Sequence, residues 1–242
     1  MSPLAQLEPL RALVSLFYPP LCVVCSAGVD AGKYLCAECE EKAPRIKPPF
    51  CEKCSEQFHG AITASFTCAN CAHRRLYFDA AVSSYRSRGI VRTLVHQFKY
   101  GRQFHLRHPL ADWLGETVTD PRLRDRRFDI LVPVPLHPAR ERERGFNQAQ
   151  LLAELLSERI SVPVRPALER IRYTTTQTAF DRAERMENLR DAFRLRKKAH
   201  VRDLRVLLID DILTTGSTLS ECARVLRKAG AISVHAATAA RA

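Results

Sequence analysis

Long apolar runs are missing from this sequence of 242 residues. A membrane-spanning helix needs roughly 18 or more consecutive apolar residues. The N-terminal stretch MSPLAQLEPLRALVSLFYPP falls short because Glu8 and Arg11 interrupt it, and it has no small-residue cleavage site of the kind that ends a secretory signal. Its apolar residues recur instead at helical spacing, as Leu7, Leu10, Val14 and Phe17. The sequence therefore predicts a short N-terminal helix, no membrane span and a cytoplasmic location.

Acidic side chains are too few to balance the basic ones. There are 26 Asp and Glu against 38 Lys and Arg, which gives a formal net charge of +12. Residues 1–79 hold eight of each sign, so the whole excess, 30 basic against 18 acidic groups, lies in residues 80–242. This excess favours a polyanionic partner for the C-terminal body. A basic surface that only keeps the protein soluble is the alternative.

Cysteines are rare outside one segment, because eight of the nine form four CxxC pairs within residues 22–71. Two residues between thiolates let a tight turn aim both sulfurs at one tetrahedral ion, and two such turns complete a four-thiolate zinc site. Zinc would supply the folding energy that so small a segment cannot gain from a core. The simplest, sequential pairing predicts two structural Zn²⁺ sites, one of Cys22, Cys25, Cys36 and Cys39 and one of Cys51, Cys54, Cys68 and Cys71.

Other uses of these cysteines fit less well. A crossed pairing of the zinc ligands is compatible with the same spacing. Disulfides are disfavoured because no secretory signal accompanies them, and thioredoxin-like chemistry does not need four repeated pairs. His59 and His73 flank the second set, but four thiolates already complete it, so both histidines are left out of the coordination. Cys222 lies at an apolar position of a predicted helix and is expected in the core.

Strands and helices alternate from Asp79 onward. Apolar runs predict strands at residues 80–85, 128–137, 204–210 and 231–238. Apolar residues at helical spacing predict three intervening helices, of which the last ends at Gly230. Their faces are Val91, Leu94, Val95 and Phe98, then Leu151, Leu152, Leu155, Leu156 and Ile160, then Leu219, Cys222, Ala223 and Leu226. The alternation predicts an α/β domain with a mostly parallel sheet covered on both faces.

The segment VLLIDDILTTGSTL, residues 206–219, joins a predicted strand to a helix. Ligands of open α/β sheets bind beyond the carboxyl ends of the strands, which is where this loop lies. Amides and hydroxyls for a phosphate, together with the positive end of the new helix, come from Thr214, Thr215, Gly216, Ser217 and Thr218. No lysine follows the glycine, so this is not a Walker motif. A phosphate-binding loop is the prediction, and a loop that only caps its own helix is the alternative.

Two carboxylates stand directly before this loop, Asp210 and Asp211. Carboxylates accept hydrogen bonds from hydroxyl groups and bind Mg²⁺. A sugar phosphate therefore fits the segment better than an isolated phosphate. The loop would take the 5′-phosphate, and the two aspartates would take the ribose 2′- and 3′-hydroxyls with the assistance of Mg²⁺.

The segment 206–219 resembles the phosphoribosyl-pyrophosphate (PRPP) motif of type I phosphoribosyltransferases. Over nearly its whole length the chain resembles the competence protein F (ComF, ComFC) family. The matching features are the paired CxxC knuckles, FKYGR at 98–102, VPVPLHPARERERGFNQAQLLA at 132–153, and the spaced Gln177, Arg185 and Asn188. RGFNQA at 144–149 is the most specific of them. The resemblance implies a double zinc-ribbon module with an N-terminal helix at 1–78 and a type I phosphoribosyltransferase-like domain at 79–242.

The resemblance also implies a pyrophosphate loop with a strained peptide near Val134 and Pro135 that exposes its amides. Arg140 and Arg144 would then pair with the pyrophosphate, because a guanidinium group matches two phosphate oxygens at once. Glutamates alternate with these arginines, so a self-neutralising exposed turn is the alternative. Asn147 is as plausible a helix cap as a ligand contact.

The polar segment 172–188 lacks apolar periodicity. It suits the flap that such enzymes close over the substrate to exclude water. A disordered surface loop is the alternative.

The reaction that the resemblance implies is the displacement of pyrophosphate from C1 of the ribose through an oxocarbenium-like state. Mg²⁺ and arginines would stabilise the leaving group, and Asp210 and Asp211, as catalytic residues, would hold the sugar. Such an enzyme would be a pentosyl glycosyltransferase. No segment clearly reads a nucleobase and no general base stands out, because a lone histidine such as His137 beside the loop is more often structural. The acceptor stays open.

Three functions from different classes follow. The first is a phosphoribosyltransferase, either of nucleotide salvage or with an unidentified acceptor. The second, which the resemblance favours as the biological role, is the handling of single-stranded DNA during DNA uptake in natural transformation, with uptake or recombination proteins as partners. The third is a sensor that binds PRPP without turnover. A candidate strip for stacking DNA bases combines Phe98, Tyr100 and Phe104 with Lys99 and Arg102, unless Phe98 is simply a core residue.

Overall fold

The structure is a computed structural model that describes residues 19–58, 60, 66–173 and 189–242. The chain divides into two compact units, residues 1–43 and 44–242. The first cysteine set belongs to the smaller unit and the second set to the larger one. The domain boundary after residue 78 stays a prediction, because these compact units are defined by packing alone. Within the described ranges, every helix is too short or too polar to cross a bilayer.

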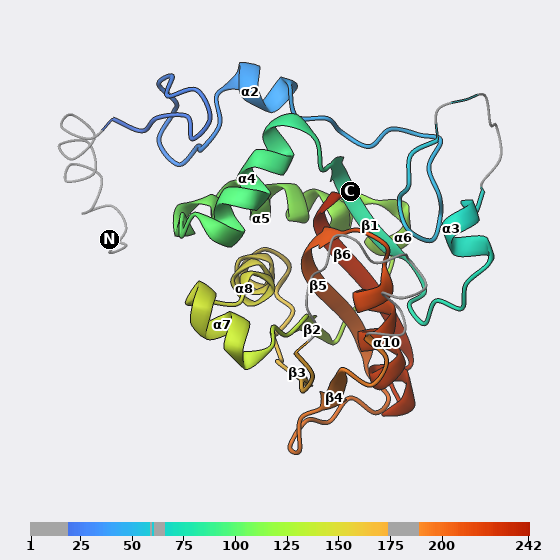
Figure 1. Ribbon diagram of the computed structural model, residues 1–242. Coiled ribbons are helices and arrows are strands. Elements are labelled where there is room, and N and C mark those ends of the chain that lie inside the picture. Colours follow the sequence, from blue (N-terminus) through green and yellow to red (C-terminus); the bar gives the residue numbers. More distant parts are fainter. Residues whose placement is uncertain (1–18, 59, 61–65, 174–188) are drawn as a thin grey trace, which may run out of the picture. The chain divides into compact units, whose positions relative to one another are not determined.

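A four-stranded parallel sheet forms the centre of the larger unit (Figure 1). Its strands lie in the order β1-β6-β5-β2. Their bounds are Ala81–Arg86 for β1, Ile130–Pro133 for β2, Arg205–Leu213 for β5 and Ser233–Arg241 for β6. All of β2 and nearly all of β6 are buried, as expected for a parallel sheet whose two faces are covered. The predicted α/β fold is confirmed, with strand ends displaced by a few residues.

Helices cover both faces of this sheet (Figure 1). On one face, α5 (Arg107–Glu116) packs against β1 and β6, and α8 (Gln148–Ile160) packs against β2 and β5. On the other face, α10 (Ser217–Lys228) packs against β5 and β6. The predicted apolar face of α10 is fully buried, including Cys222, as is the predicted face of α4 (Gly89–Tyr100). Each large apolar side chain buried in this way contributes about 1.5–3 kcal/mol.

Short elements connect these layers. Between α4 and β2 the chain forms η1 (Phe104–Leu106), α5, η2 (Thr117–Thr119) and α6 (Pro121–Arg124). Helix α7 (Pro138–Arg144) lies directly before α8, and β3 (Leu168–Arg170) pairs antiparallel with β4 (Phe193–Leu195). Of the two short helices that begin after a cysteine, α2 (Ala37–Glu41) belongs to the smaller unit and α3 (Ala69–Ala72) to the larger one.

Candidate functional site

Each cysteine set gathers its sulfur atoms into one cluster. The four ligand atoms of each set lie within 4.8 Å of one another, and the cysteines are free thiols. Thiolates at about 2.3 Å from a tetrahedral zinc ion stand roughly 3.8 Å apart, and the sulfurs of Cys25 and Cys36 are 3.6 Å apart. Both donor sets therefore fit structural Zn²⁺, and the sequential pairing is confirmed. His73 belongs to neither cluster, and His59 lies outside the described residues.

The loop from β5 to α10 turns at Gly216, whose φ of 77° lies in the left-handed region that favours glycine. A Cβ atom at this position would stand 3.5 Å from the Phe78 ring and 3.6 Å from Leu213. The turn therefore packs closely on the body of the unit. Because β5 is parallel to its neighbours, this loop lies at the carboxyl edge of the sheet, where the sequence predicts a ligand.

The predicted phosphate-binding residues differ in exposure. Thr214 is exposed, Thr215 and Thr218 are half-buried, and Ser217 is 3% exposed. The hydroxyl oxygens of Thr215 and Ser217 are 2.9 Å apart. The Thr215 hydroxyl also accepts a long hydrogen bond of 3.4 Å from the Ser217 amide, while Gly216, at the N-cap position, has no side chain to cap the helix. The loop thus caps its own helix only weakly, through one long hydrogen bond.

Asp211 points toward α4 and α8 and is 1% exposed. One carboxylate oxygen lies 2.6 Å from the Lys99 ammonium nitrogen, and the other accepts a hydrogen bond of 3.4 Å from the Gln148 side-chain amide. Sequence reasoning placed Lys99 in a stacking strip and overlooked Gln148. The available signal was that both lie in distinctive blocks, FKYGR and RGFNQA.

Asp210 points to the opposite face, because neighbouring side chains alternate along a strand. Its carboxylate accepts a hydrogen bond of 2.9 Å from the Asp211 amide. Burial, with a further contribution from the Asp211 charge, raises the pKa of Asp210 to about 8. Cys222 lies on the same side of the sheet as Asp210, and its pKa is raised mainly by burial and secondly by the Asp210 charge. The two aspartates thus occupy different environments: Asp211 is paired with Lys99, whereas the Asp210 carboxyl is desolvated by burial on the other face of the sheet.

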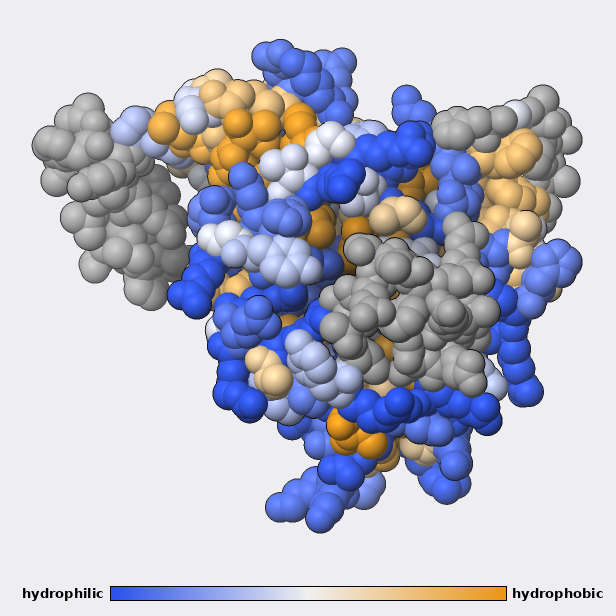
Figure 2. Space-filling model, in the orientation of Figure 1, coloured by the Kyte–Doolittle hydropathy of each residue, from blue (hydrophilic) through white to orange (hydrophobic). Residues whose placement is uncertain are grey.

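A basic pocket of about 270 Å³ adjoins this strand end. Four cations line it together with one carboxylate, Glu143; the cations are Lys99, Arg102, Arg140 and Arg144. The Arg144 guanidinium lies over the Tyr100 ring and that of Arg140 over the Tyr173 ring. Arg144 also donates to the Gln148 side chain, which in turn reaches Asp211. The structure thus brings both predicted pyrophosphate arginines to one pocket and connects that pocket to the acidic pair. The surface around α7 is largely hydrophilic (Figure 2).

Both backbone groups of Val134 already form hydrogen bonds within the protein. The Val134 amide donates to the Ile209 carbonyl at 2.9 Å, and the Val134 carbonyl accepts from the Asn147 side chain at 3.1 Å. The strained peptide expected near Val134 and Pro135 is not seen. In the described part of the chain the cis peptide joins Pro48 to Pro49, and neither Val134 nor Pro135 has a positive φ. The Val134 amide is therefore not available to pyrophosphate in this structure.

Two polar residues around this loop act as helix caps. Asn147 accepts a hydrogen bond of 3.0 Å from the Ala149 amide at the start of α8. His137 accepts one of 3.2 Å from the Ala139 amide at the start of α7. The capping alternative for Asn147 and the structural role of His137 are thus borne out. Residues 174–188, which include most of the predicted flap and Gln177, Arg185 and Asn188, lie outside the described residues.

A larger cavity of about 810 Å³ lies beside the ends of β1, β5 and β6. Basic and aromatic side chains in its lining include Arg86, Arg88, Arg92, His96 and Tyr100. Glu56, the acidic side chain among its described lining residues, pairs with Arg241. Of the predicted stacking strip, Phe98 is a core residue with 0% exposure, whereas Tyr100 is 62% and Phe104 is 43% exposed. The cavity thus combines uncompensated positive charge with an exposed aromatic ring.

Two domain families match the chain. The Double zinc ribbon domain matches residues 13–72, and the Phosphoribosyl transferase domain matches residues 145–242. Fold, cysteine clusters and matches together define a phosphoribosyltransferase-type domain that carries zinc ribbons.

Relatives match over almost the full chain. Competence protein F of Haemophilus influenzae is 31% identical over 220 residues, which cover 88% of this chain and 93% of that protein. DNA utilization protein YhgH of Escherichia coli K12 is 30% identical over 228 residues, 91% of this chain and 96% of that protein. Competence protein ComFC of Bacillus subtilis is 29% identical over 214 residues, 86% of this chain and 84% of that protein. The chain belongs to the competence protein F family.

Solved structures resemble it more distantly. An adenine phosphoribosyltransferase from Thermoanaerobacter pseudethanolicus is 18% identical, with 57% of this chain and 70% of that chain covered and a TM-score of 0.36.

Proposed function

We propose that this chain binds PRPP together with Mg²⁺ at the carboxyl edge of its sheet. The observation that carries the proposal is the double role of Lys99, which lines the basic pocket of α7 and also contacts Asp211 at the end of β5. Through Lys99, a pocket suited to pyrophosphate is continuous with a strand end suited to ribose. The loop to α10, suited to a phosphate, follows directly along the chain.

Each part of PRPP has a counterpart at this edge. The 5′-phosphate would accept hydrogen bonds from the amides and hydroxyls of residues 214–218. The ribose hydroxyls would lie at the end of β5, where Asp210 would accept their hydrogen bonds and Asp211, on the other face, would hold Lys99 in place. The pyrophosphate would lie in the basic pocket and pair with Arg140 and Arg144. Val134 and Pro135 are not among the described residues that line this pocket, and Pro135 lines a separate pocket of about 280 Å³ with Asn147 and Arg170.

Bound in this way, PRPP would be set up for loss of pyrophosphate. When bound, Mg²⁺ would neutralise charge on the leaving group. The arginines would hold the pyrophosphate as its negative charge grows, and the aspartates would fix the ribose so that C1 faces an acceptor. The larger cavity at the ends of β1, β5 and β6 would be the place for that acceptor.

Titration calorimetry with Mg²⁺ and PRPP tests the proposal. We expect saturable binding of one PRPP for each chain. Pyrophosphate release on addition of an acceptor would establish a transferase, whereas binding without release would make the protein a PRPP sensor. Absence of binding at millimolar PRPP, in protein with its zinc content verified, would contradict the proposal.

A second function is the handling of single-stranded DNA in the cytoplasm, alongside uptake or recombination proteins. The cavity lined by Arg86, Arg88 and Arg92 favours it, because arginines that follow a phosphate backbone and exposed aromatic rings that stack on bases are the usual components of such sites. The exposed Tyr100, packed against His96 with ring centroids 4.9 Å apart, offers such a stacking surface.

Charge reversal in the cavity tests this second function. In Arg88→Glu/Arg92→Glu we expect weaker binding of an oligothymidine strand and a shallower dependence of affinity on salt, by roughly 0.7 for each lost phosphate contact. Fluorescence anisotropy over a series of salt concentrations measures both quantities. Lys197→Glu/Lys198→Glu is the matched control, because it changes the net charge equally at exposed residues after β4. Equal losses in the two variants would show that only net charge matters.

A further inference from the structure

The second cysteine set is built into the body of the larger unit. Cys51, Cys54 and Cys71 are 0%, 3% and 6% exposed and belong to the same buried cluster as Phe78 and Leu219. Cys54 also carries a direct link to the sheet, because its carbonyl accepts a hydrogen bond of 3.2 Å from the Arg241 side chain at the end of β6. A metal ion held by these thiolates would therefore be part of the same packed core as the site.

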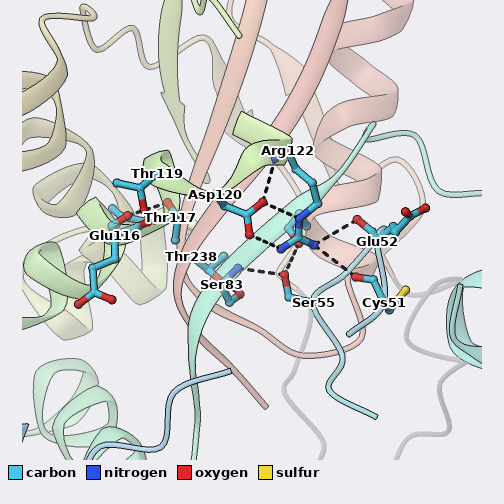
Figure 3. Close-up of polar contacts among 12 residues, drawn as sticks. Cys51, Glu52, Ser55, Ser83, Glu116, Thr117, Thr119, Asp120, Arg122 and Thr238 are labelled. Atoms are coloured by element: carbon cyan, nitrogen blue, oxygen red, sulfur yellow. Dashed lines mark hydrogen bonds and ion pairs between the residues drawn. The ribbon is translucent and has the colours of Figure 1, made fainter. Parts of the chain in front are cut away.

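Hydrogen bonds from two sides hold the first CxxC turn of this set, Cys51 to Cys54, which we call the first knuckle (Figure 3). Arg122 donates to the carbonyls of Cys51 and Glu52 at 3.3 Å and 3.2 Å. Ser55 donates to the Ala81 carbonyl at 3.1 Å and accepts from the Ser83 amide at 3.2 Å. These bonds tie the knuckle to β1 and α6. A metal ion bound by all four cysteines would then fix the second CxxC turn, Cys68 to Cys71, relative to β1 and α6.

Arg74 connects the second CxxC turn, Cys68 to Cys71, which is the second knuckle, to the loop between β5 and α10. It follows the last ligand, Cys71, by three residues, and its guanidinium donates to the Asn70 side chain at 2.8 Å. The same guanidinium donates to the Thr215 carbonyl at 3.0 Å and to the Ser217 hydroxyl at 2.9 Å. One side chain thus bridges the second knuckle and both sides of Gly216. A parallel link runs from the Tyr77 amide to the Ser220 hydroxyl at 3.2 Å.

These contacts orient the donors that a phosphate would use. In a planar trans peptide the carbonyl and the following amide point in opposite directions. By holding the Thr215 carbonyl, Arg74 directs the Gly216 amide to the other side of the loop. Because the Ser217 oxygen accepts from Arg74, its hydrogen is directed elsewhere, to Thr215 or to a ligand.

We infer that Arg74 is a positioning residue for the 5′-phosphate, and that the metal ion of Cys51, Cys54, Cys68 and Cys71 sets the affinity of the loop by holding Arg74 in place. The inference rests on the proposed PRPP function. It assigns different roles to the two metal sites. The site of Cys22, Cys25, Cys36 and Cys39 belongs to the other compact unit, and we expect its removal to leave phosphate binding unchanged.

Binding of three ligands distinguishes a positioning role of Arg74 from a general loss of structure in its variants. We expect Arg74→Met to weaken binding of ribose 5-phosphate and of Mg²⁺ with PRPP by the same factor, about tenfold, as for the loss of hydrogen bonds to a charged group. Inorganic pyrophosphate, which would bind at Arg140 and Arg144, keeps its affinity. Arg74→Lys restores part of the loss because an ammonium group retains donors. Calorimetry measures each dissociation constant.

Arg75→Met is the matched control, because Arg75 is the exposed neighbour whose guanidinium lies over the Tyr77 ring. We expect it to bind all three ligands like the wild type. Wild-type affinity of Arg74→Met for ribose 5-phosphate would overturn the inference, as would a loss that extends equally to pyrophosphate. Failure of the wild type to bind PRPP or ribose 5-phosphate would instead overturn the proposed function.

The metal itself is tested with paired cysteine variants. Cys25→Ser/Cys36→Ser and Cys54→Ser/Cys68→Ser should each lose one of two zinc ions by elemental analysis. Only the second should lose affinity for ribose 5-phosphate. If that variant does not fold, the wild type is used instead. Coupling between binding sites is reciprocal at equilibrium, so saturating ribose 5-phosphate must raise the chelator concentration that removes half of one of the two zinc ions at equilibrium. Equal removal of both ions with and without the ligand contradicts the role of the metal.

Discussion

Replacement of Lys99 by methionine is expected to lower the free energy of unfolding by about 3–5 kcal/mol, the usual cost of removing one partner from a buried ion pair. Asp211 is 1% exposed and Lys99 is 17% exposed at its side chain, with 2.6 Å between their charged atoms. Without Lys99, among the residues that the structure describes, the Asp211 carboxylate keeps only the 3.4 Å contact from Gln148. It must then stay charged without a cation or take up a proton, and either outcome costs stability. Urea unfolding measures the change.

A second substitution shows whether the unpaired Asp211 carboxylate causes the loss of stability. Lys99→Met/Asp211→Asn removes both charges, so it should recover most of the stability. Arg194→Met is the control, because Arg194 pairs with Glu169 at an exposed position and should cost at most about 1 kcal/mol. If Lys99→Met costs no more than Arg194→Met, the Asp211 contact is not the support that the structure indicates.

Loss of the acidic pair is expected to weaken the binding of PRPP. In Asp210→Ala/Asp211→Ala we expect at least a tenfold rise in the dissociation constant for PRPP with Mg²⁺, since one charge-assisted hydrogen bond is worth about 1.5–3 kcal/mol. The single variant Asp210→Asn should carry much of this effect with little change in stability, because burial already disfavours the Asp210 charge in the folded protein and Lys99 keeps its partner Asp211. Titration calorimetry at fixed Mg²⁺ measures the dissociation constant of each variant.

Glu158→Ala is the control for this experiment, because Glu158 is exposed on α8 and lies outside the site. Its dissociation constant should equal that of the wild type. A double variant that folds, as judged by its unfolding transition, and still binds PRPP with wild-type affinity would reject the ribose role of the aspartates.

Local patterns sufficed for much of the fold. The faces of α4 and α10 follow from helical spacing, because each helix buries its own stripe of apolar residues. The CxxC spacing likewise fixes the ligand sets, because two residues between thiolates set the geometry of a knuckle. Both inferences need only near neighbours in the sequence.

Contacts between distant segments could not be predicted in this way. Lys99 meets Asp211, and Arg74 meets Ser217, only because the order β1-β6-β5-β2 brings those segments together. The CxxC spacing that both cysteine sets share also hides the difference between them. Cys25 is exposed in the smaller unit, whereas Cys51 is buried in the core of the larger one. The surroundings of a motif, rather than the motif, decide what it supports.

A crystal structure with Mg²⁺ and PRPP tests the central claim most directly. We expect the 5′-phosphate on the amides of residues 215–218, the ribose hydroxyls at Asp210 and Asp211, and the pyrophosphate beside Arg140 and Arg144. PRPP bound at another place, or an empty loop in crystals saturated with the ligand, would contradict the claim.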